Sequence, residues 1–233
     1  MTLSLVFMAL LMGAIVWWLL RQTVNVQPWQ AQMAVKDVHA SALERPAAKT
    51  ALWIFLGVAT SLFALFLSAY AMRLNFLDWT PIPQPRLLLA NTAVLIVASL
   101  AMEWTVFAAR RADLERVRKG LLASGVLTCA FLAGQLVVWK QLGDAGYFLA
   151  SSAATGFFYL LTAVHGAHVL GGLVAWGRTA RRVQRGDSVG SIRLSVELCA
   201  IYWHFLLIVW IVLFAVLASN YLGLSICTPA VPL

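Results

Sequence analysis

Six long apolar stretches constrain the fold of this chain more than any other feature. Each holds about 20 or more mostly apolar residues, the length that an α-helix needs to cross a bilayer. They are Leu3–Leu20, Ala51–Met72, Leu87–Ala109, Gly120–Trp139, Ser151–Gly177 and Leu194–Gly223. None alternates apolar and polar residues, and each is apolar on most of its circumference. We therefore predict an all-α fold, a polytopic membrane bundle of six transmembrane helices and not a barrel.

The composition agrees with a membrane protein. Of the 233 residues, 62% are hydrophobic and only 11% are charged, whereas a soluble domain carries about 25% charged residues. The three cysteines, Cys129, Cys199 and Cys227, have no CxxC spacing. They are therefore interpreted as small packing residues and not as a disulfide or zinc set.

The placement of the basic residues predicts the orientation of the helices. Segments 21–50, 110–119 and 178–193 hold 14 of the 17 lysines and arginines, and alternate connections are poor in them. Cytoplasmic loops of membrane proteins carry such an excess. We therefore expect these three segments on the cytoplasmic side and both termini on the outer side. The net charge of +8 is then explained by basic residues that orient the helices in the membrane. We therefore predict no nucleic-acid partner.

The long polar connection divides the chain into a lone first helix and a compact set of five. A cleaved signal peptide is the alternative for the first stretch, which lacks a basic segment before it and an obvious cleavage site. We favour a retained helix. The predicted organisation is an N-terminal helix over 1–20, a cytoplasmic loop over 21–50, a five-helix membrane domain over 51–223 and a short outer tail over 224–233.

Three of the four histidines lie in the last two apolar stretches. His165 and His168 are three residues apart and share a helix face. His168 and His204 each lie roughly 13–15 Å from the inner end of their helix, so they could meet in an antiparallel pair. Such imidazoles could ligate a haem or a metal ion. Alternatively, they form with Glu197 a buried polar network that stabilises the bundle, and we favour this because further metal ligands are lacking.

Glu103 and Glu197 are the only carboxylates within the six stretches. Both are shallow on the predicted cytoplasmic side, where water or Arg110 and Arg111 could solvate them. One interpretation is a role in proton uptake, and the other is an interfacial carboxylate paired with arginine. We favour the second, because no third intramembrane carboxylate continues a relay across the bilayer.

Small residues recur every four positions on the fifth stretch, at Ala163, Ala167, Gly171 and Ala175. Such a stripe lets helix backbones approach closely, so we predict a helix-packing role. The sequence contains no P-loop, no dinucleotide-binding glycine motif, no CxxCH haem attachment and no Ser/His/Asp set. We therefore predict no catalytic centre, and a partner role in a larger assembly.

Three short motifs occur in order along residues 50–223. The first is the WIFL string Trp53–Leu56, and the second is an HGxHVxxG string with His165, His168 and Gly172. The third is E-x6-H with a YWHF run, at Glu197 and Tyr202–Phe205. A basic connection after a tryptophan-containing helix, from Trp104 to Lys119, accompanies them. Together they resemble subunit III of the haem-copper terminal oxidases.

The chain departs from that family at three carboxylate positions, which here are Ala59, Val138 and Leu207. Any proton role of those positions in the family does not transfer to this chain. The first helix also differs from the usual N-terminal pair of the family. The resemblance is thus to a divergent member, of a bacterial branch.

The resemblance implies an accessory subunit of an oxidoreductase complex in the bacterial inner membrane. Haem and copper would be held by partner subunits and not by this chain, with subunits I and II and membrane phospholipids as partners. The chain would pack on subunit I, bind lipids and support proton uptake and complex stability. Residues expected to stabilise the bundle or to line lipid and subunit interfaces are His165, His168, Glu197, Trp203, His204 and Glu103.

Two alternatives stay open. One is an accessory protein of nitric oxide reductase, which also has subunit III-like relatives. The other is a membrane electron-transfer protein that binds haem b through His165 or His168 together with His204.

Overall fold

The structure, a computed structural model, describes residues 40–74, 86–187 and 189–219. The chain forms two compact units, Met1–Ala48 and Lys49–Leu233, and the first is described only at residues 40–48. The predicted first helix over Leu3–Leu20 lies outside the described residues.

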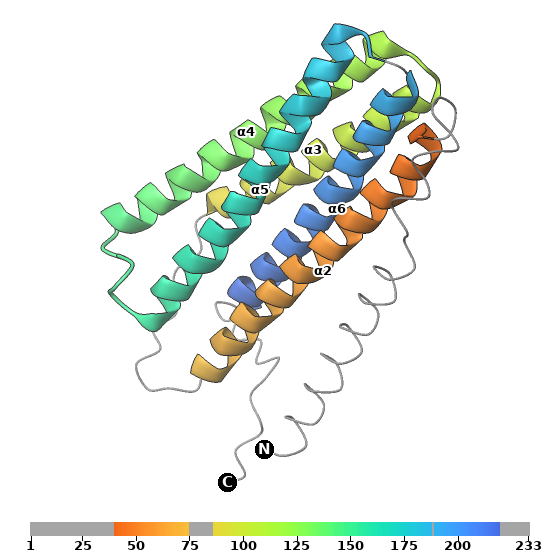
Figure 1. Cartoon of the computed structure of the whole chain (residues 1–233). Helices are drawn as coiled ribbons and strands as arrows, with labels where there is room; N and C mark the ends of the chain where they lie inside the picture. Colours follow the sequence, from red (N-terminus) through yellow and green to blue (C-terminus); the bar gives the residue numbers. More distant parts are fainter. Residues whose placement is uncertain (1–39, 75–85, 188, 220–233) are drawn as a thin grey trace, which may run out of the picture. The chain divides into compact units, whose positions relative to one another are not determined.

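The described residues form five helices and no strands (Figure 1). They are α2 (Ala40–Arg73), α3 (Arg86–Arg110), α4 (Leu114–Asp144), α5 (Ala153–Arg185) and α6 (Val189–Ser219). Each is long and apolar enough to cross a membrane. The all-helical class and five of the six predicted spanning helices are thereby confirmed.

The helices run past the apolar stretches that predicted them. α4 begins at Leu114 and α5 continues to Arg185, so the basic segments predicted as loops are largely helical. α2 likewise begins at Ala40, within the loop predicted over 21–50. Charged residues continue a helix readily once it leaves the apolar layer, because they are good helix formers.

Short capped turns separate the helices at their basic ends. The side chain of Asp113 caps α4 by accepting a hydrogen bond from the Arg116 backbone N–H at 3.1 Å. Gly186 ends α5 with φ of 75°, the left-handed conformation that glycine adopts without strain. These tight connections make α3 and α4, and α5 and α6, antiparallel neighbours. We call the end of the bundle that carries Arg110, Arg116, Arg182 and Arg193 the basic end.

Four helices pack directly on one another, with α3 against α4 and α6, and α5 against α4 and α6. Two buried tryptophans of α6 form hydrogen bonds to neighbouring helices. Trp203 donates from its indole nitrogen to Thr128 Oγ1 at 3.0 Å, and Trp210 donates to Thr92 Oγ1 at 3.0 Å. Both rings are almost wholly buried. Since their only polar atom has a partner, these rings add apolar contact without an orphaned donor.

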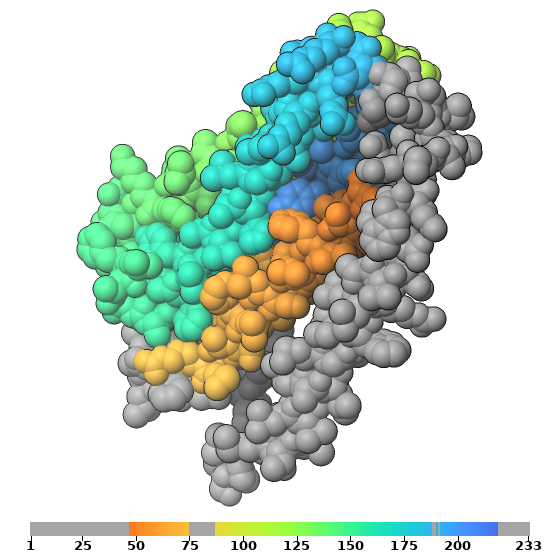
Figure 2. All heavy atoms as spheres, in the orientation of Figure 1, coloured from red at the N-terminus to blue at the C-terminus, as the bar shows by residue number. Residues whose placement is uncertain are grey.

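The backbone of α2 stays further from its neighbours than those of the other four helices. Large side chains make its contacts: Phe63 and Tyr70 of α2 pack with Leu161 of α5 and Leu213 of α6. In Figure 2, α6 (blue) is visible between α2 (orange) and α5 (teal). A helix packed through long side chains leaves room for a cleft on its flank.

Candidate functional site

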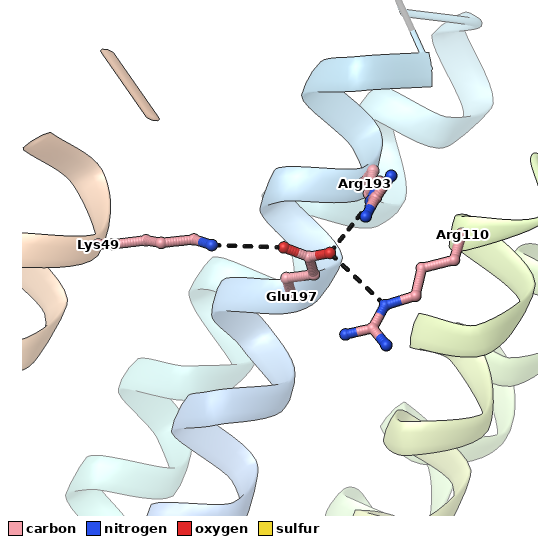
Figure 3. Close-up of polar contacts among 4 residues, drawn as sticks. All are labelled: Lys49, Arg110, Arg193 and Glu197. Carbon is pink, nitrogen blue, oxygen red and sulfur yellow. Dashed lines mark hydrogen bonds and ion pairs between the residues drawn. The ribbon is translucent and has the colours of Figure 1, made fainter. Parts of the chain in front are cut away.

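The basic end holds an ion cluster around a single carboxylate (Figure 3). Glu197 of α6 lies 3.1 Å from Arg193 Nε one turn earlier, 3.7 Å from Arg110 Nε at the end of α3, and 3.6 Å from Lys49 Nζ on α2. One carboxylate therefore joins three helices, and the site keeps two excess positive charges. The sequence predicted an interfacial Glu197 paired with arginine, and its distances to Arg193 and Arg110 agree. Lys49 and Arg193 were not foreseen as partners.

A second polar site lies deeper on the same face of α6, at His204. Ser99 Oγ of α3 lies 2.6 Å from His204 Nδ1, and Glu103 Oε2 lies 3.1 Å from His204 Nε2. A neutral imidazole with its proton on Nε2 satisfies both bonds, because it donates to Glu103 and accepts from the Ser99 hydroxyl. Ser99 was missed, since a lone serine in an apolar helix gives no signal in the sequence.

Ser99, His204 and Glu103 are linked by hydrogen bonds as the serine, histidine and acid of a hydrolytic triad are, but their exposure does not suit acyl transfer. Ser99 is only 3% exposed, so a substrate cannot reach its hydroxyl. His204 and Glu103 are instead the exposed members. The geometry fits a hydrogen-bonded link between α3 and α6 whose outer side is open.

His204 and His168 do not meet, and the predicted facing pair is wrong. His204 points to α3, while His168 bonds the Val164 carbonyl oxygen at 2.8 Å and packs on Phe63 of α2. The reason is the rotation of α6 about its axis. Tyr202 donates its hydroxyl to the His168 carbonyl oxygen at 2.9 Å. His204, two residues on, is turned about 200° away from Tyr202. Because His168 and His204 do not face each other, this pair does not have the arrangement that a shared haem would need.

His165 lies in the centre of the bundle and is fully buried. Aromatic rings surround it, with centroids 5.0 Å away for Trp210, 5.9 Å for Phe131 and 6.4 Å for Phe63. Among the described residues, neither ring nitrogen of His165 has a hydrogen-bond partner. The predicted network of histidines with Glu197 is therefore divided into three separate places, and His165 acts there as a packing group.

The small-residue stripe of α5 is not where the described helices approach closely. Ala163, Ala167, Gly171 and Ala175 are all exposed. On α5 a close approach occurs instead at Gly172, where an added Cβ would lie 2.8 Å from the Tyr202 ring. The helix-packing role predicted for the stripe stays a prediction.

A cleft of about 380 Å³ lies between α2, α5 and α6, near the basic end. Its walls are mostly apolar, and its polar members are mainly two arginines of α5, Arg178 and Arg182. Arg182 also donates from Nη1 to Ser195 Oγ at 3.1 Å. The main apolar lining residues are Leu52, Phe55, Ala175, Leu198, Tyr202 and Trp203. The cleft thus pairs an apolar floor with a cationic side.

Within 40–74, 86–187 and 189–219, no three His, Cys, Asp or Glu side chains gather as a metal ion requires. The polar residues described above form helix–helix links, and two of the arginines line the cleft between α2, α5 and α6.

Comparisons with known proteins agree with the motifs. The family model described as Cytochrome c oxidase subunit III matches residues 50–221. A probable cytochrome c oxidase subunit 3 of Nocardia farcinica is 33% identical over 157 residues, which cover 66% of this chain and 76% of that protein. Its counterpart in Mycobacterium tuberculosis is 34% identical over 159 residues, 67% and 77% of the two chains. Cytochrome c oxidase subunit 3 of Synechocystis is 32% identical over 171 residues, 69% and 70% of the two chains.

The matched region contains α3 to α6 and the part of α2 from residue 50 onward. It also contains the two carboxylates and the three histidines of the spans, which are Glu103, Glu197, His165, His168 and His204. The resemblance stated from the motifs is confirmed: this multi-pass membrane chain belongs to the cytochrome c oxidase subunit III family.

Proposed function

We propose that this chain is the non-catalytic subunit III of a respiratory haem-copper oxidase in a bacterial inner membrane. It packs against the catalytic subunit I, binds phospholipid, and supports proton uptake and stability of the complex. Haem and copper belong to subunits I and II in this proposal. The bacterial sources of the relatives and the cluster of arginines at the basic end support this location.

The cleft between α2, α5 and α6 is the observation that carries the lipid-binding part. Its volume of about 380 Å³ lies in the range of small-molecule sites, which are mostly apolar with a few placed polar groups. The apolar floor suits an acyl chain, and Arg178 and Arg182 suit the phosphate of a headgroup. If the basic end faces the cytoplasm, the lipid comes from the inner leaflet.

The two carboxylates within the spans differ in their suitability for proton uptake. Glu197 is held by three cations, so it is a fixed countercharge and a poor proton carrier. Glu103 has one described partner, His204, and both side chains are about two-fifths exposed. Of the two carboxylates within the described helices, Glu103, paired with His204, is therefore the one suited to exchange a proton with a neighbouring subunit.

Affinity purification of the tagged chain from its native membrane in mild detergent tests the assignment. We expect core oxidase subunits in the eluate and haem bands in its reduced-minus-oxidised spectrum. Core subunits of a nitric oxide reductase would move the chain to that complex. Haem on the chain alone would replace the proposal with the electron-transfer alternative.

The lipid site has a sharper test in the purified complex. The double variant Arg178→Gln/Arg182→Gln should lose tightly bound phospholipid, measured by mass spectrometry of the extracted lipids. Arg181→Gln is the matched control, since Arg181 is exposed on the same helix and does not line the cleft. Equal lipid content in the double variant and the control would refute this assignment.

A further inference from the structure

We propose that the outer face of α3 and α6 around Glu103 and His204 is the docking surface for a transmembrane helix of a partner subunit. This helix presents a hydrogen-bond donor to the Glu103 carboxylate. We call the surface the Glu103 face, and its residues are Ile96, Leu100, Glu103, His204, Ile208 and Ile211. The inference rests on the proposed function, because it requires a partner subunit.

The Glu103–His204 pair is more exposed than the other carboxylate and the central histidine within the spans. The side chains of His204 and Glu103 are 42% and 39% exposed. The Glu197 side chain is 18% exposed, and His165 is fully buried. Among the described residues within the spans, the pair therefore presents a hydrogen-bonding group outward from the bundle.

The sequence predicted a shallow Glu103 that water could reach, but the pair lies about 10 Å in from the basic end, where exposure of its polar atoms to lipid is costly. Glu103 precedes Arg110, the last residue of α3, by seven residues, which is about 10 Å along a helix. His204 follows Glu197 by seven residues on α6, so it lies equally deep relative to the ion cluster. The hydrocarbon core is about 30 Å thick. Ionisable residues at such depth almost always face other helices or a water-filled cavity.

Exposed apolar side chains surround the pair. Ile96 and Leu100 lie beside it on α3, and Ile208 and Ile211 lie beside it on α6. An apolar surface with one central hydrogen-bonding group is typical of a helix–helix interface in membranes, where polar side chains bond across the contact.

The chemistry of the pair identifies its occupant. His204 uses both ring nitrogens, on Ser99 and on Glu103, whereas a carboxylate can accept several hydrogen bonds. The open position is thus an acceptor, and it needs a donor. Lipid tails carry no donor. A second copy of this face would bring two Glu103 carboxylates together, so a different helix with a donor side chain fits best.

Photo-cross-linking in the native membrane tests the location. A photoreactive amino acid at Leu100 or at Ile208 should cross-link to a core oxidase subunit. Leu122 on α4 and Leu65 on α2 are the matched controls, because both are exposed apolar residues on other helices. Cross-links from the controls alone, cross-links to a second copy of this chain, or lipid adducts alone at Leu100 and Ile208 would overturn the inference.

Variants of Glu103 test the donor. Glu103→Leu should weaken retention of the core subunits in detergent by roughly 3- to 20-fold, the range measured for hydrogen bonds between membrane helices. Glu103→Gln keeps an acceptor oxygen and should retain most of the binding. Unchanged retention in a Glu103→Leu variant that unfolds at the wild-type temperature contradicts the proposal. Absence of core subunits from the wild-type eluate would instead refute the proposed function itself.

Discussion

Replacing Glu197 by glutamine is expected to lower the free energy of unfolding of the full chain by about 1–3 kcal/mol. The substitution keeps the shape of the side chain but removes its charge. Lys49, Arg110 and Arg193 then face one another at the basic end without a counter-ion. The tie between α2, α3 and α6 is lost together with the ion pairs.

The magnitude follows from the geometry and exposure of the three pairs. Charges 4 Å apart interact by about 4 kcal/mol at an effective dielectric constant of 20. The cationic side chains are 47–53% exposed, so solvent screens most of this. Exposed pairs typically contribute about 0.2–1 kcal/mol each. Three such pairs sum to about 0.6–3 kcal/mol, and the shared carboxylate is only 18% exposed, so we expect the upper part of that range, about 1–3 kcal/mol. That loss is equivalent to a fall in Tm of roughly 2–12 °C for a chain of this size.

Thermal unfolding in mild detergent measures the effect, with Glu115→Gln as the matched control. Glu115 pairs with Lys119 at 2.8 Å on the surface of α4, and its side chain is 78% exposed. The control should leave the free energy of unfolding nearly unchanged, because solvent screens this exposed pair. High salt should narrow the gap between wild type and Glu197→Gln, because it screens charges. Equal shifts in the two variants would refute a special role for the cluster.

Two further substitutions probe the packing of α5 and α6. Gly172→Ala should destabilise the chain by about 1–3 kcal/mol in thermal unfolding, because the added Cβ would lie 2.8 Å from the Tyr202 ring. Gly171→Ala should be neutral or stabilising, since its Cβ would meet nothing within 4 Å, and the reverse order would contradict the packing described. Trp203→Phe should cost about 1–3 kcal/mol by leaving Thr128 Oγ1 without its donor. A double-mutant cycle with Thr128→Val should then give a nonzero coupling energy, and strict additivity would exclude the bond.

Local properties of the chain were readable from its sequence. Length and continuous apolarity specify a spanning helix, because a helix satisfies all backbone groups within one segment and a barrel strand would alternate apolar and polar residues. The stretches at 51–72, 87–109, 120–139, 151–177 and 194–223 therefore correspond to α2–α6. Helix ends were less readable, because charged residues such as those before Gly120 extend a helix beyond the apolar layer.

The tertiary structure decided which side chains meet. Equal depth made His168 and His204 plausible partners, but depth is only one coordinate of a residue on a helix. The rotation of each helix about its axis is the other, and it is set by how all large side chains of the bundle pack together. Tyr202 faces α5, so His204 turns to Ser99 and Glu103 of α3. The sequence by itself determined a membrane bundle of one family, and the packing of the helices determined which of its polar groups stay partly exposed.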